Sequence, residues 1–385
     1  MTGNRKKVLF LIESLAGGGA EKVLSVLVAH LDKTKFDVTV LSVVNTGIHI
    51  DSIQKHAHYQ FFLDNPASDR SFWSRLVYRV KYNLIQKLPG RLAYRWLIKD
   101  AFEFEVAFIE GLATKIISAS INPRSRKLAW VHTDLQANHW TKLVFHTLQR
   151  EAQSYRRFDQ IVCVSRQVKD SLASLLGIVE RTSVLHNPVD TREILQKAEE
   201  GLPVAEDRST LRLVSTGRLV EQKGYDRLLN IHKRLLDDGL AHELWILGEG
   251  PQRPQLEAYL QQHQLEGSVR LWGFLANPYA IMRQCDLFVC SSLAEGFSTA
   301  VTEALILGIP VITTDCSGMR ELLGDQEGFG IITGNSEDAL YDGLKSLLTE
   351  PERLAHYRRQ AILRGQEFGL KQTLPAVEAL LEGVI

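Results

Sequence analysis

The sequence predicts an α/β protein built from two doubly wound parallel-sheet domains, and three observations support that class. Short, unbroken apolar runs alternate with segments in which apolar residues recur at helical spacing, which is typical of parallel sheets covered by helices. The alternation stops near residue 190 and begins again near residue 211. The 385 residues also suffice for two domains of ordinary size, each with its own core.

The first expected domain spans residues 1–190. It begins with an apolar strand over Val8–Ile12, a glycine-rich turn and a helix over about residues 20–31. The further expected strands are Phe36–Val44, Glu105–Ile109, Lys127–His132, Gln160–Val164 and Thr182–Leu185. Strands that alternate with helices predict a Rossmann-like sheet, in which ligands bind outside the carboxyl ends of the strands.

The second expected domain spans residues 191–367 and repeats this layout. It follows a charged segment over residues 190–210 that lacks periodicity and predicts a linker. The expected strands are Leu211–Thr216, Glu243–Leu247, Ser268–Trp272, Asp286–Ser291 and Ile309–Thr313. A last helical pattern covers Leu370–Leu381, and we expect the C-terminal helix, about residues 368–385, to pack back on the first domain.

Composition excludes several classes of function. The 45 Lys and Arg balance 45 Asp and Glu, and no nucleic-acid-binding motif occurs, so we expect no nucleic-acid partner. The four cysteines form no C-x-x-C pair, and three of them lie in or beside apolar stretches, which favours a reduced compartment. The apolar run at residues 8–12 is too short for a signal peptide. No run reaches the roughly 18 apolar residues of a membrane span, so we expect a cytoplasmic protein.

Three glycines, Gly17, Gly18 and Gly19, open the first expected helix. Glycine lets the backbone approach a ligand closely, and a helix N-terminus favours an anion such as phosphate. The spacing does not fit the dinucleotide-binding fingerprint, because position 22 is lysine rather than glycine. An ordinary strand-to-helix turn would also explain the three glycines.

Two cations follow the expected strand Leu211–Thr216 by only a few residues. They belong to the pairs Gly217-Arg218 and Lys223-Gly224. Two fixed positive charges at the carboxyl end of a strand can clamp a diphosphate. The alternative is a solvated surface, where most lysine and arginine side chains lie.

Two glutamates frame the start of another expected helix. Glu295 falls in the turn after the strand Asp286–Ser291. Ser298 is a suitable N-cap residue, and Glu303 lies inside the helix. The N–H groups of a helix start can hold a phosphate, and a carboxylate in the helix can bind ribose hydroxyls. Two ordinary glutamates on a capped helix would show the same spacing. The pair alone therefore does not distinguish a nucleotide site from an ordinary helix.

Taken together, the motifs of the second half resemble the retaining glycosyltransferases of GT-B fold with the E-x7-E signature, the family 4-like, group 1 enzymes. The matching blocks are Gly217-Arg218-x4-Lys223-Gly224, Leu247-Gly248-x-Gly250-Pro251, Val269-x3-Gly273-Phe274, Ser292-x2-Glu295-Gly296-Phe297-x5-Glu303-Ala304 and Gly308-x-Pro310-Val311-Ile312. They occur in order over about residues 211–335. The first half matches more loosely, through Gly17–Gly19 and Trp130-Val131-His132-Thr133-Asp134. The resemblance implies two Rossmann-like domains that face each other across a deep cleft.

The resemblance also implies a role for each matching residue. Arg218 and Lys223 would bind the donor diphosphate and offset the charge of the leaving group. Glu295 would contact the transferred sugar, and Glu303 would bind the ribose of the nucleotide. His132 would lie near the reacting carbon and help to place the sugar or the acceptor. The other donor-binding residues would be Gly18 and Gly19 at the diphosphate, Phe274 along the nucleobase, Phe297, Ser298 and Thr299 at phosphate, and Gly248 and Gly296.

The implied activity is transfer of a sugar, with retention, from a nucleotide diphosphate sugar to a glycan or lipid-linked acceptor, as in polysaccharide or glycolipid biosynthesis. UDP is the preferred nucleotide. Two cations can stabilise the leaving group as a divalent metal does in other transferases, so we expect neither metal nor cofactor. Front-face transfer is preferred over a covalent intermediate on Glu295, and the residues leave both open.

A basic, aromatic segment lies between residues 70 and 99. Its cations are Arg70, Arg75, Arg79, Lys81, Lys87, Arg91, Arg95 and Lys99, and no acid occurs among them. Its aromatic residues are Phe72, Trp73, Tyr78, Tyr82, Tyr94 and Trp96. This mixture predicts contact with an anionic membrane surface, on the inner face of the cell membrane. The alternative is two ordinary helices with their aromatic rings packed inside.

Two further functions compete with a sugar transferase. One is a non-catalytic subunit that binds a nucleotide sugar, and the other is an epimerase or a phosphorylase of the same fold. The complete set of polar residues in the matching motifs argues against a silent subunit. A phosphorylase would need a pyridoxal lysine site, and the sequence offers no recognisable one.

Overall fold

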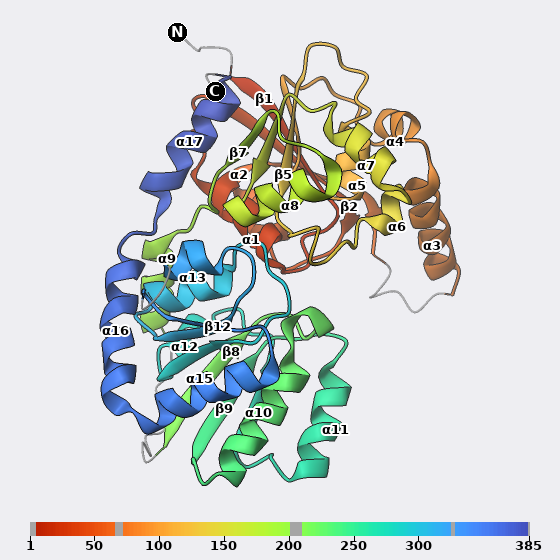
Figure 1. Cartoon of the computed structure of the whole chain (residues 1–385). Helices are drawn as coiled ribbons and strands as arrows, with labels where there is room; N and C mark the ends of the chain where they lie inside the picture. Colours follow the sequence, from red (N-terminus) through yellow and green to blue (C-terminus); the bar gives the residue numbers. More distant parts are fainter. Residues whose placement is uncertain (1–4, 66–71, 201–209, 325–327, 384–385) are drawn as a thin grey trace. The chain divides into compact units, whose positions relative to one another are not determined.

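The computed structural model of the chain describes residues 5–65, 72–200, 210–324 and 328–383 (Figure 1). The chain divides into two compact units. The first unit comprises Met1–Pro188 and Lys371–Ile385, and the second unit comprises Val189–Leu370. The C-terminal helix therefore belongs to the first unit.

The first unit is built on a parallel sheet of seven strands in the order β3-β2-β1-β4-β5-β6-β7. The strands are β1 Lys6–Ile12, β2 Phe36–Asn45, β3 His58–Asp64, β4 Phe104–Ala107, β5 Arg126–Val131, β6 Gln160–Cys163 and β7 Thr182–Val184. The central strands are apolar and almost wholly buried because helices cover both faces. The strand order reverses between β1 and β4, which is where parallel sheets of this kind bind ligands.

The helices of the first unit are α1 Gly19–His30, α2 Ile50–His56, α3 Phe72–Lys87, α4 Gly90–Leu97, α5 Leu112–Ile117, α6 Lys142–Phe145, α7 Leu148–Tyr155, α8 Arg166–Leu176 and α17 Leu370–Glu382. Polar contacts hold α17 beside the start of β1, a central strand of the sheet (Figure 1). The Lys6 ammonium donates to the carbonyl of Glu382 at 2.6 Å, and the Asp32 amide donates to the Glu378 carboxylate at 3.0 Å. The buried residues Val377, Leu380 and Leu381 add an apolar contact.

The second unit repeats the architecture with a parallel sheet of six strands in the order β10-β9-β8-β11-β12-β13. The strands are β8 Leu211–Thr216, β9 His242–Leu247, β10 Val269–Gly273, β11 Leu287–Cys290, β12 Val311–Thr314 and β13 Ile331–Thr333. The order reverses between β8 and β11, so the loops that follow these two strands emerge side by side.

The helices of the second unit are α9 Thr191–Glu199, the 3₁₀ turn η2 Glu221–Lys223, α10 Tyr225–Asp237, α11 Arg253–His263, α12 Tyr279–Met282, α13 Thr299–Ile306, α14 Met319–Leu323, α15 Glu337–Thr349 and α16 Pro351–Gly365. In Figure 1, α10 and α11 lie on one side of the sheet next to β9. The apolar face of α10 packs on the strands of the sheet. It consists of Leu228, Leu229, Ile231 and Leu235, which share a buried cluster with Leu213, Leu244 and Ile246. Burial of these side chains provides the main free energy that holds the helix to the sheet.

The sequence predictions of the fold are confirmed, with two strands missed and one segment misjudged. Every expected strand is present within three residues of its expected ends. The edge strands β3 and β13 were not anticipated, because the exposed residues of β3 and the brevity of β13 leave no continuous apolar run.

The prediction that residues 190–210 form a linker is wrong for its first half. Residues Thr191–Glu199 form α9, which Asp190 caps by accepting a hydrogen bond from the amide of Glu193 at 3.0 Å. Only Ile194 and Ala198 are buried in it, so the helix shows too narrow an apolar face for periodicity to reveal. Residues 201–209 lie outside the described part of the chain. Among the described residues, no helix is long and apolar enough to cross a membrane.

Candidate active site

The loop after β8 carries the two predicted cations of the second unit. Gly217 opens it, and its amide donates to the carbonyl of Leu247 at the end of β9. Gly248 has φ +143°, and a Cβ atom there would lie 1.9 Å from the Gly217 carbonyl oxygen, so only glycine fits. The close approach of these two strand ends leaves Arg218 exposed at the surface.

Lys223 and Glu295 meet at the point where the strand order reverses. The Lys223 ammonium lies 2.6 Å from Oε1 of Glu295, and the Ser292 hydroxyl donates to the same oxygen at 2.6 Å. Their side chains are 23% and 10% exposed, so the pair is largely buried but not wholly closed off from solvent. Burial alone would lower the pKa of Lys223, but the nearby Glu295 carboxylate raises it above its ordinary value. The lysine is therefore a permanent cation in this site.

Backbone and side-chain hydrogen bonds join the loops that carry this ion pair. The amide of Leu293 donates to the carbonyl of Gln222 at 2.7 Å, and the Gln222 side chain donates to the carbonyl of Ala294 at 2.8 Å. The Ser291 hydroxyl donates to the Lys223 carbonyl at 2.9 Å. These bonds hold the cation and the carboxylate in a fixed arrangement, as charge stabilisation by a preorganised site requires.

Arg227 is a residue of this site that sequence reasoning missed. It lies in the first turn of α10 and is buried. Its guanidinium donates to the carbonyls of Ser291 and Ser292, each at 2.7 Å, and to the side chain of Asn335 at 2.9 Å. It thus anchors the turn before Glu295 to the helix after Lys223. The sequence feature that could have identified Arg227 is its position three residues after Gly224, on the face of the helix that is buried.

The start of α13 carries several of the predicted donor-binding residues. Ser298 caps the helix, and its hydroxyl accepts a hydrogen bond from the amide of Val301 at 3.4 Å. Gly296 and Phe297 are buried in the turn before it, Thr299 begins the helix, and Glu303 is buried within it. A helix start offers N–H groups and a favourable dipole to an anion.

A second glycine contact shapes this turn. Gly318 has φ +80°, and a Cβ atom there would lie 2.5 Å from the carbonyl oxygen of Gly296. The loop after β12 therefore packs directly on the turn that contains Glu295.

Phe274, the predicted nucleobase contact, follows β10 and leaves 51% of its surface exposed. An exposed aromatic ring at a strand end is available for stacking on a base.

The glycine loop of the first unit follows β1, at that unit's own reversal of strand order. Gly18 is the N-cap of α1 with φ −79°, and Gly19 is the first residue of the helix. Gly17 has φ +98°, a value that favours glycine. A Cβ atom on Gly47 would lie 1.7 Å from the carbonyl oxygen of Leu15, so the loops after β1 and β2 are also in close contact.

His132 directly follows β5 and carries a neutral imidazole. Burial lowers its pKa to about 3, and a hydrogen bond with the backbone of Phe108 only partly opposes the shift. Its ring lies 5.1 Å from the Phe108 ring, between centroids. Within the described part of the chain, its buried Nε2 atom has no hydrogen-bond partner. The imidazole therefore has one polar atom whose hydrogen bonding is unsatisfied among the described residues.

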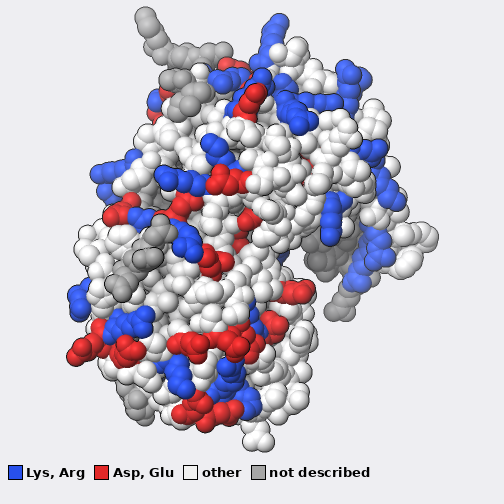
Figure 2. Space-filling model, in the orientation of Figure 1, with Lys and Arg blue, Asp and Glu red and all other residues white. Residues whose placement is uncertain are grey.

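The basic, aromatic segment forms α3 and α4, and its residue Arg70 lies outside the described residues. Lys and Arg side chains gather over these two helices in Figure 2. Trp73 and Trp96 are 71% and 37% exposed, whereas Tyr94 is buried. Exposed apolar residues also occur on these helices, namely Phe72, Leu76, Val77, Val80, Leu84 and Leu92. The surface therefore combines cations with unpartnered apolar side chains.

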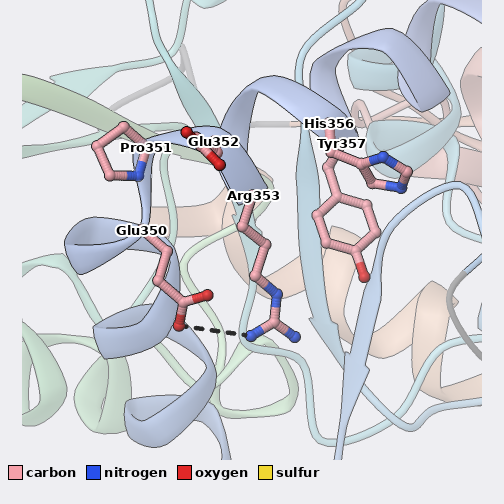
Figure 3. A pocket seen from close by; sticks show the side chains of 6 residues that line it. All are labelled: Glu350, Pro351, Glu352, Arg353, His356 and Tyr357. Atoms are coloured by element: carbon pink, nitrogen blue, oxygen red, sulfur yellow. Dashed lines mark ion pairs between the residues drawn. The ribbon is translucent and has the colours of Figure 1, made fainter.

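A hollow of about 830 Å³ lies at the start of α16. Figure 3 shows the side chains that line it, which are Glu350, Pro351, Glu352, Arg353, His356 and Tyr357. Glu350 and Arg353 form an ion pair across 3.9 Å there. None of the predicted site residues lines this hollow. Across the described ranges, no group of three or more His, Cys, Asp and Glu residues is arranged to hold a metal ion.

Comparison with known proteins matches both halves of the chain to families. Residues 203–364 match the family Glycosyl transferases group 1, and residues 17–193 match Glycosyltransferase Family 4. A curated relative is the N-acetylgalactosamine-N,N'-diacetylbacillosaminyl-diphospho-undecaprenol 4-alpha-N-acetylgalactosaminyltransferase of Campylobacter jejuni. It is 28% identical over 370 residues, which cover 94% of this chain and 96% of the relative.

Solved structures share the fold over the whole chain. HepE of Anabaena, in complex with UDP and glucose, superposes with a TM-score of 0.76 at 19% identity, covering 98% of this chain and 100% of that one. Sucrose-phosphate synthase of Thermosynechococcus elongatus has a TM-score of 0.77 at 16% identity and covers 99% of both chains.

Proposed function

The chain belongs to the glycosyltransferases that join a family 4 domain to a group 1 domain on the GT-B fold, and from this premise we propose that it transfers a sugar, with retention, from a UDP-sugar to a glycan or lipid-linked acceptor. Enzymes of this type act in polysaccharide and glycolipid biosynthesis. UDP occurs in the structure of HepE, and the Campylobacter jejuni relative acts on an undecaprenyl diphosphate-linked acceptor. These similarities support the choice of donor and acceptor class.

The ion pair of Lys223 and Glu295 is the observation that carries this proposal. Breaking the bond between sugar and diphosphate places new negative charge on the leaving group. A cation that stays charged, 2.6 Å from a carboxylate, is suited to stabilise that charge while the carboxylate binds sugar hydroxyls. We assign Arg218 to the same diphosphate and Glu303 to the ribose.

The remaining donor contacts and His132 complete the proposed assignment. Backbone groups at Ser298 and Thr299 would hold phosphate, and Phe274 would lie along the base. In the first unit, Gly18 and Gly19 would approach the diphosphate from the start of α1. His132 would place the sugar or the acceptor through its unpartnered Nε2 atom. The cations would make a divalent metal unnecessary.

We further propose that α3 and α4 dock the enzyme on an anionic membrane surface. A lipid-linked acceptor stays in the bilayer, so the enzyme must come to it. Exposed cations on the two helices would attract anionic headgroups, and the exposed rings of Trp73 and Trp96 would lie at headgroup level. The partial exposure of both tryptophans argues against the alternative in which the aromatic rings are packed inside.

The test of the activity is UDP release from a panel of four donors: UDP-glucose, UDP-galactose, UDP-N-acetylglucosamine and UDP-N-acetylgalactosamine. Each donor is incubated alone and with lipid-linked saccharide acceptors. The proposal expects UDP release with one donor and a product whose anomeric configuration matches that donor. Binding of UDP without turnover would favour a non-catalytic subunit. Conversion of the sugar while it remains attached to UDP would favour an epimerase.

A further inference from the structure

Glu110 is a buried carboxylic acid that no predicted role uses. It follows β4 and is wholly buried. Its Oε1 atom accepts hydrogen bonds from the backbone N–H groups of His132 and Thr133, each at 2.5 Å. These are the first two residues after β5, the parallel neighbour of β4. One carboxylate oxygen therefore joins the end of β4 to the start of the loop that carries the imidazole.

The amides of His132 and Thr133 are bound more strongly by the ionised form of Glu110 than by its protonated form. A buried backbone N–H group needs a hydrogen-bond partner, and a carboxylate is a stronger acceptor than a neutral oxygen. Burial nevertheless disfavours the charge and raises the pKa of Glu110 to about 7, although hydrogen bonds from its own backbone amide, from Thr133 and from His132 act in the opposite direction. The protonation state of Glu110 therefore changes near neutral pH.

Two titratable side chains face Glu110, and neither of them carries a positive charge. Tyr155 faces it from α7, Cys163 faces it from β6, and Glu151 lies near Tyr155. Glu151 is paired with His139 at 2.8 Å, and its Oε2 atom makes that contact. The Oε2 atom of Glu110 has no hydrogen-bond partner within the described residues. The contacts that favour the ionised Glu110 carboxylate are its own backbone amide, the amides of Thr133 and His132 and the side chain of Thr133.

The geometry separates Glu110 from the imidazole itself. The carboxylate contacts the backbone of His132, whereas the ring bonds to the backbone of Phe108 and packs on the Phe108 ring. Glu110 can therefore move the imidazole only by moving the loop. A change of hydrogen bonding at the amide would displace the ring relative to a substrate without altering its charge.

We propose that Glu110 is a positioning residue for His132, and that it holds the imidazole in its working place only while the carboxylate is ionised. The inference rests on the proposed function, in which His132 contacts the sugar or the acceptor. When Glu110 binds a proton, Oε1 becomes a weaker acceptor for both amides, and the start of the loop loosens. A displacement of about 1 Å can lower a rate by up to about a hundredfold.

The proposal predicts an acidic limb in the pH dependence of turnover. Activity is full where Glu110 is ionised and falls as pH drops through the pKa of this carboxyl, near neutrality. His132 cannot produce this limb, because its own pKa lies at about 3. Glu110→Gln keeps an oxygen that can accept from both amides but removes the titration. The variant should turn over about tenfold to a hundredfold more slowly at neutral pH, with the acidic limb lost.

Glu105→Gln is the matched control. Glu105 lies on β4, the strand that Glu110 follows, and is equally buried, but it contacts Tyr94 at 2.7 Å rather than the loop after β5. Turnover of the most active UDP-sugar from the panel is measured for wild type and both variants from about pH 5 to about pH 9. Glu105→Gln should keep the limb of the wild type. A limb that persists in Glu110→Gln would overturn the proposal, since another group would then cause it.

A second readout needs neither substrate nor a variant of Glu110. Protein labelled with ¹⁵N-histidine reports the amide of His132 by NMR, and the signal is assigned through its loss in His132→Asn. In the wild type, this amide should lie downfield and shift with pH around the pKa of Glu110. An amide that does not titrate between about pH 5 and about pH 9 would exclude the inference.

The two readouts separate this inference from the proposed function. Full activity in His132→Asn would remove His132 from the site and leave the amide titration as a structural property without catalytic effect. Loss of activity in His132→Asn, together with wild-type kcat and pH profile in Glu110→Gln, would reject Glu110 alone. The proposal requires loss of turnover in both variants and an amide of His132 that titrates.

Discussion

The ammonium of Lys223 and the Oε1 atom of Glu295 lie 2.6 Å apart, although 72 residues separate them in the chain. The loops after β8 and β11 bring them together because these strands are parallel neighbours at the reversal of strand order. The pair links the leaving group of the proposed reaction to the transferred sugar. It is therefore the first target for substitution.

Replacing Lys223 with alanine should lower kcat by about a hundredfold or more, the usual effect of losing one preorganised group that stabilises developing charge. Arg218→Ala should act in the same direction through the diphosphate. The measurement is UDP release at saturating donor. Lys233→Ala is the control, since Lys233 pairs with Asp237 on the surface of α10. Wild-type turnover in Lys223→Ala would show that this cation does not act on the leaving group.

Glu303→Gln should weaken donor binding more than it slows the chemical step. The side chain is buried in α13, and the substitution keeps its size while removing a charged acceptor, which is worth about 1.5–3 kcal/mol. The donor KM should rise roughly tenfold to a hundredfold, and UDP binding should weaken by a similar factor in calorimetry. The exposed Glu257 provides the control, as Glu257→Gln. Unchanged affinity for UDP would remove Glu303 from the nucleotide site.

Chelation of metal ions should leave transfer nearly unchanged. Lys223 and Arg218 are proposed to stabilise the leaving group in place of a divalent cation. Initial rates are compared before and after dialysis against EDTA, and again after addition of magnesium or manganese. Activity that disappears on dialysis and returns with manganese would contradict this account of the diphosphate site.

The helices α3 and α4 should bind vesicles that contain anionic lipid, and high salt should release the protein. Attraction of exposed charges is screened beyond about 8 Å at physiological ionic strength. Replacing Arg75, Arg79, Lys81 and Lys87 with glutamine should abolish co-sedimentation with anionic vesicles and leave release of UDP from the donor intact. Vesicles of neutral lipid serve as the control. Failure of the wild type to sediment with anionic vesicles at low salt would refute membrane docking through this surface.

Acid should destabilise the second unit through the buried pair His232 and His242. Their ring nitrogens lie 2.8 Å apart, and burial lowers the pKa of His232 to about 3 and also lowers that of His242. Because the unfolded state binds protons first, stability is complete above the unfolded pKa of about 6.5 and falls with pH down to the folded pKa. His232 alone contributes a loss of about 1.4 kcal/mol per pH unit within that window.

Hydrogen exchange measures this effect locally. Protection of α10 and β9, corrected for the intrinsic exchange rate, should decrease from about pH 7 to about pH 5, and helices far from the pair provide the internal reference. The amides of α8, in the first unit, are a suitable comparison. Equal pH dependence in α8 and α10 would assign the acid sensitivity to another group.

Much of the fold could be predicted from the sequence, together with the types of side chain that follow the central strands. Apolar runs mark β1, β5, β8 and β11 because strands buried on both faces tolerate few polar residues. The motifs around Gly217, Lys223 and Glu295 follow the carboxyl ends of strands. Parallel strands place these ends at one edge of the sheet, so the motifs are expected to lie near one another. The edge strand β3 and the helix α9 escaped prediction, because both leave most of their residues exposed and show no clear period.

The sequence by itself determined the two sheets, their helices and the types of side chain at the strand ends, because these depend on local periodicity and on residues close in the chain. Only the tertiary structure decided which side chains meet. The contacts of Arg227 with the turn before Glu295, and of Glu110 with the amide of His132, join residues that lie 22 or more positions apart. Such pairings depend on strand order and on the angle of each loop, which no single segment specifies.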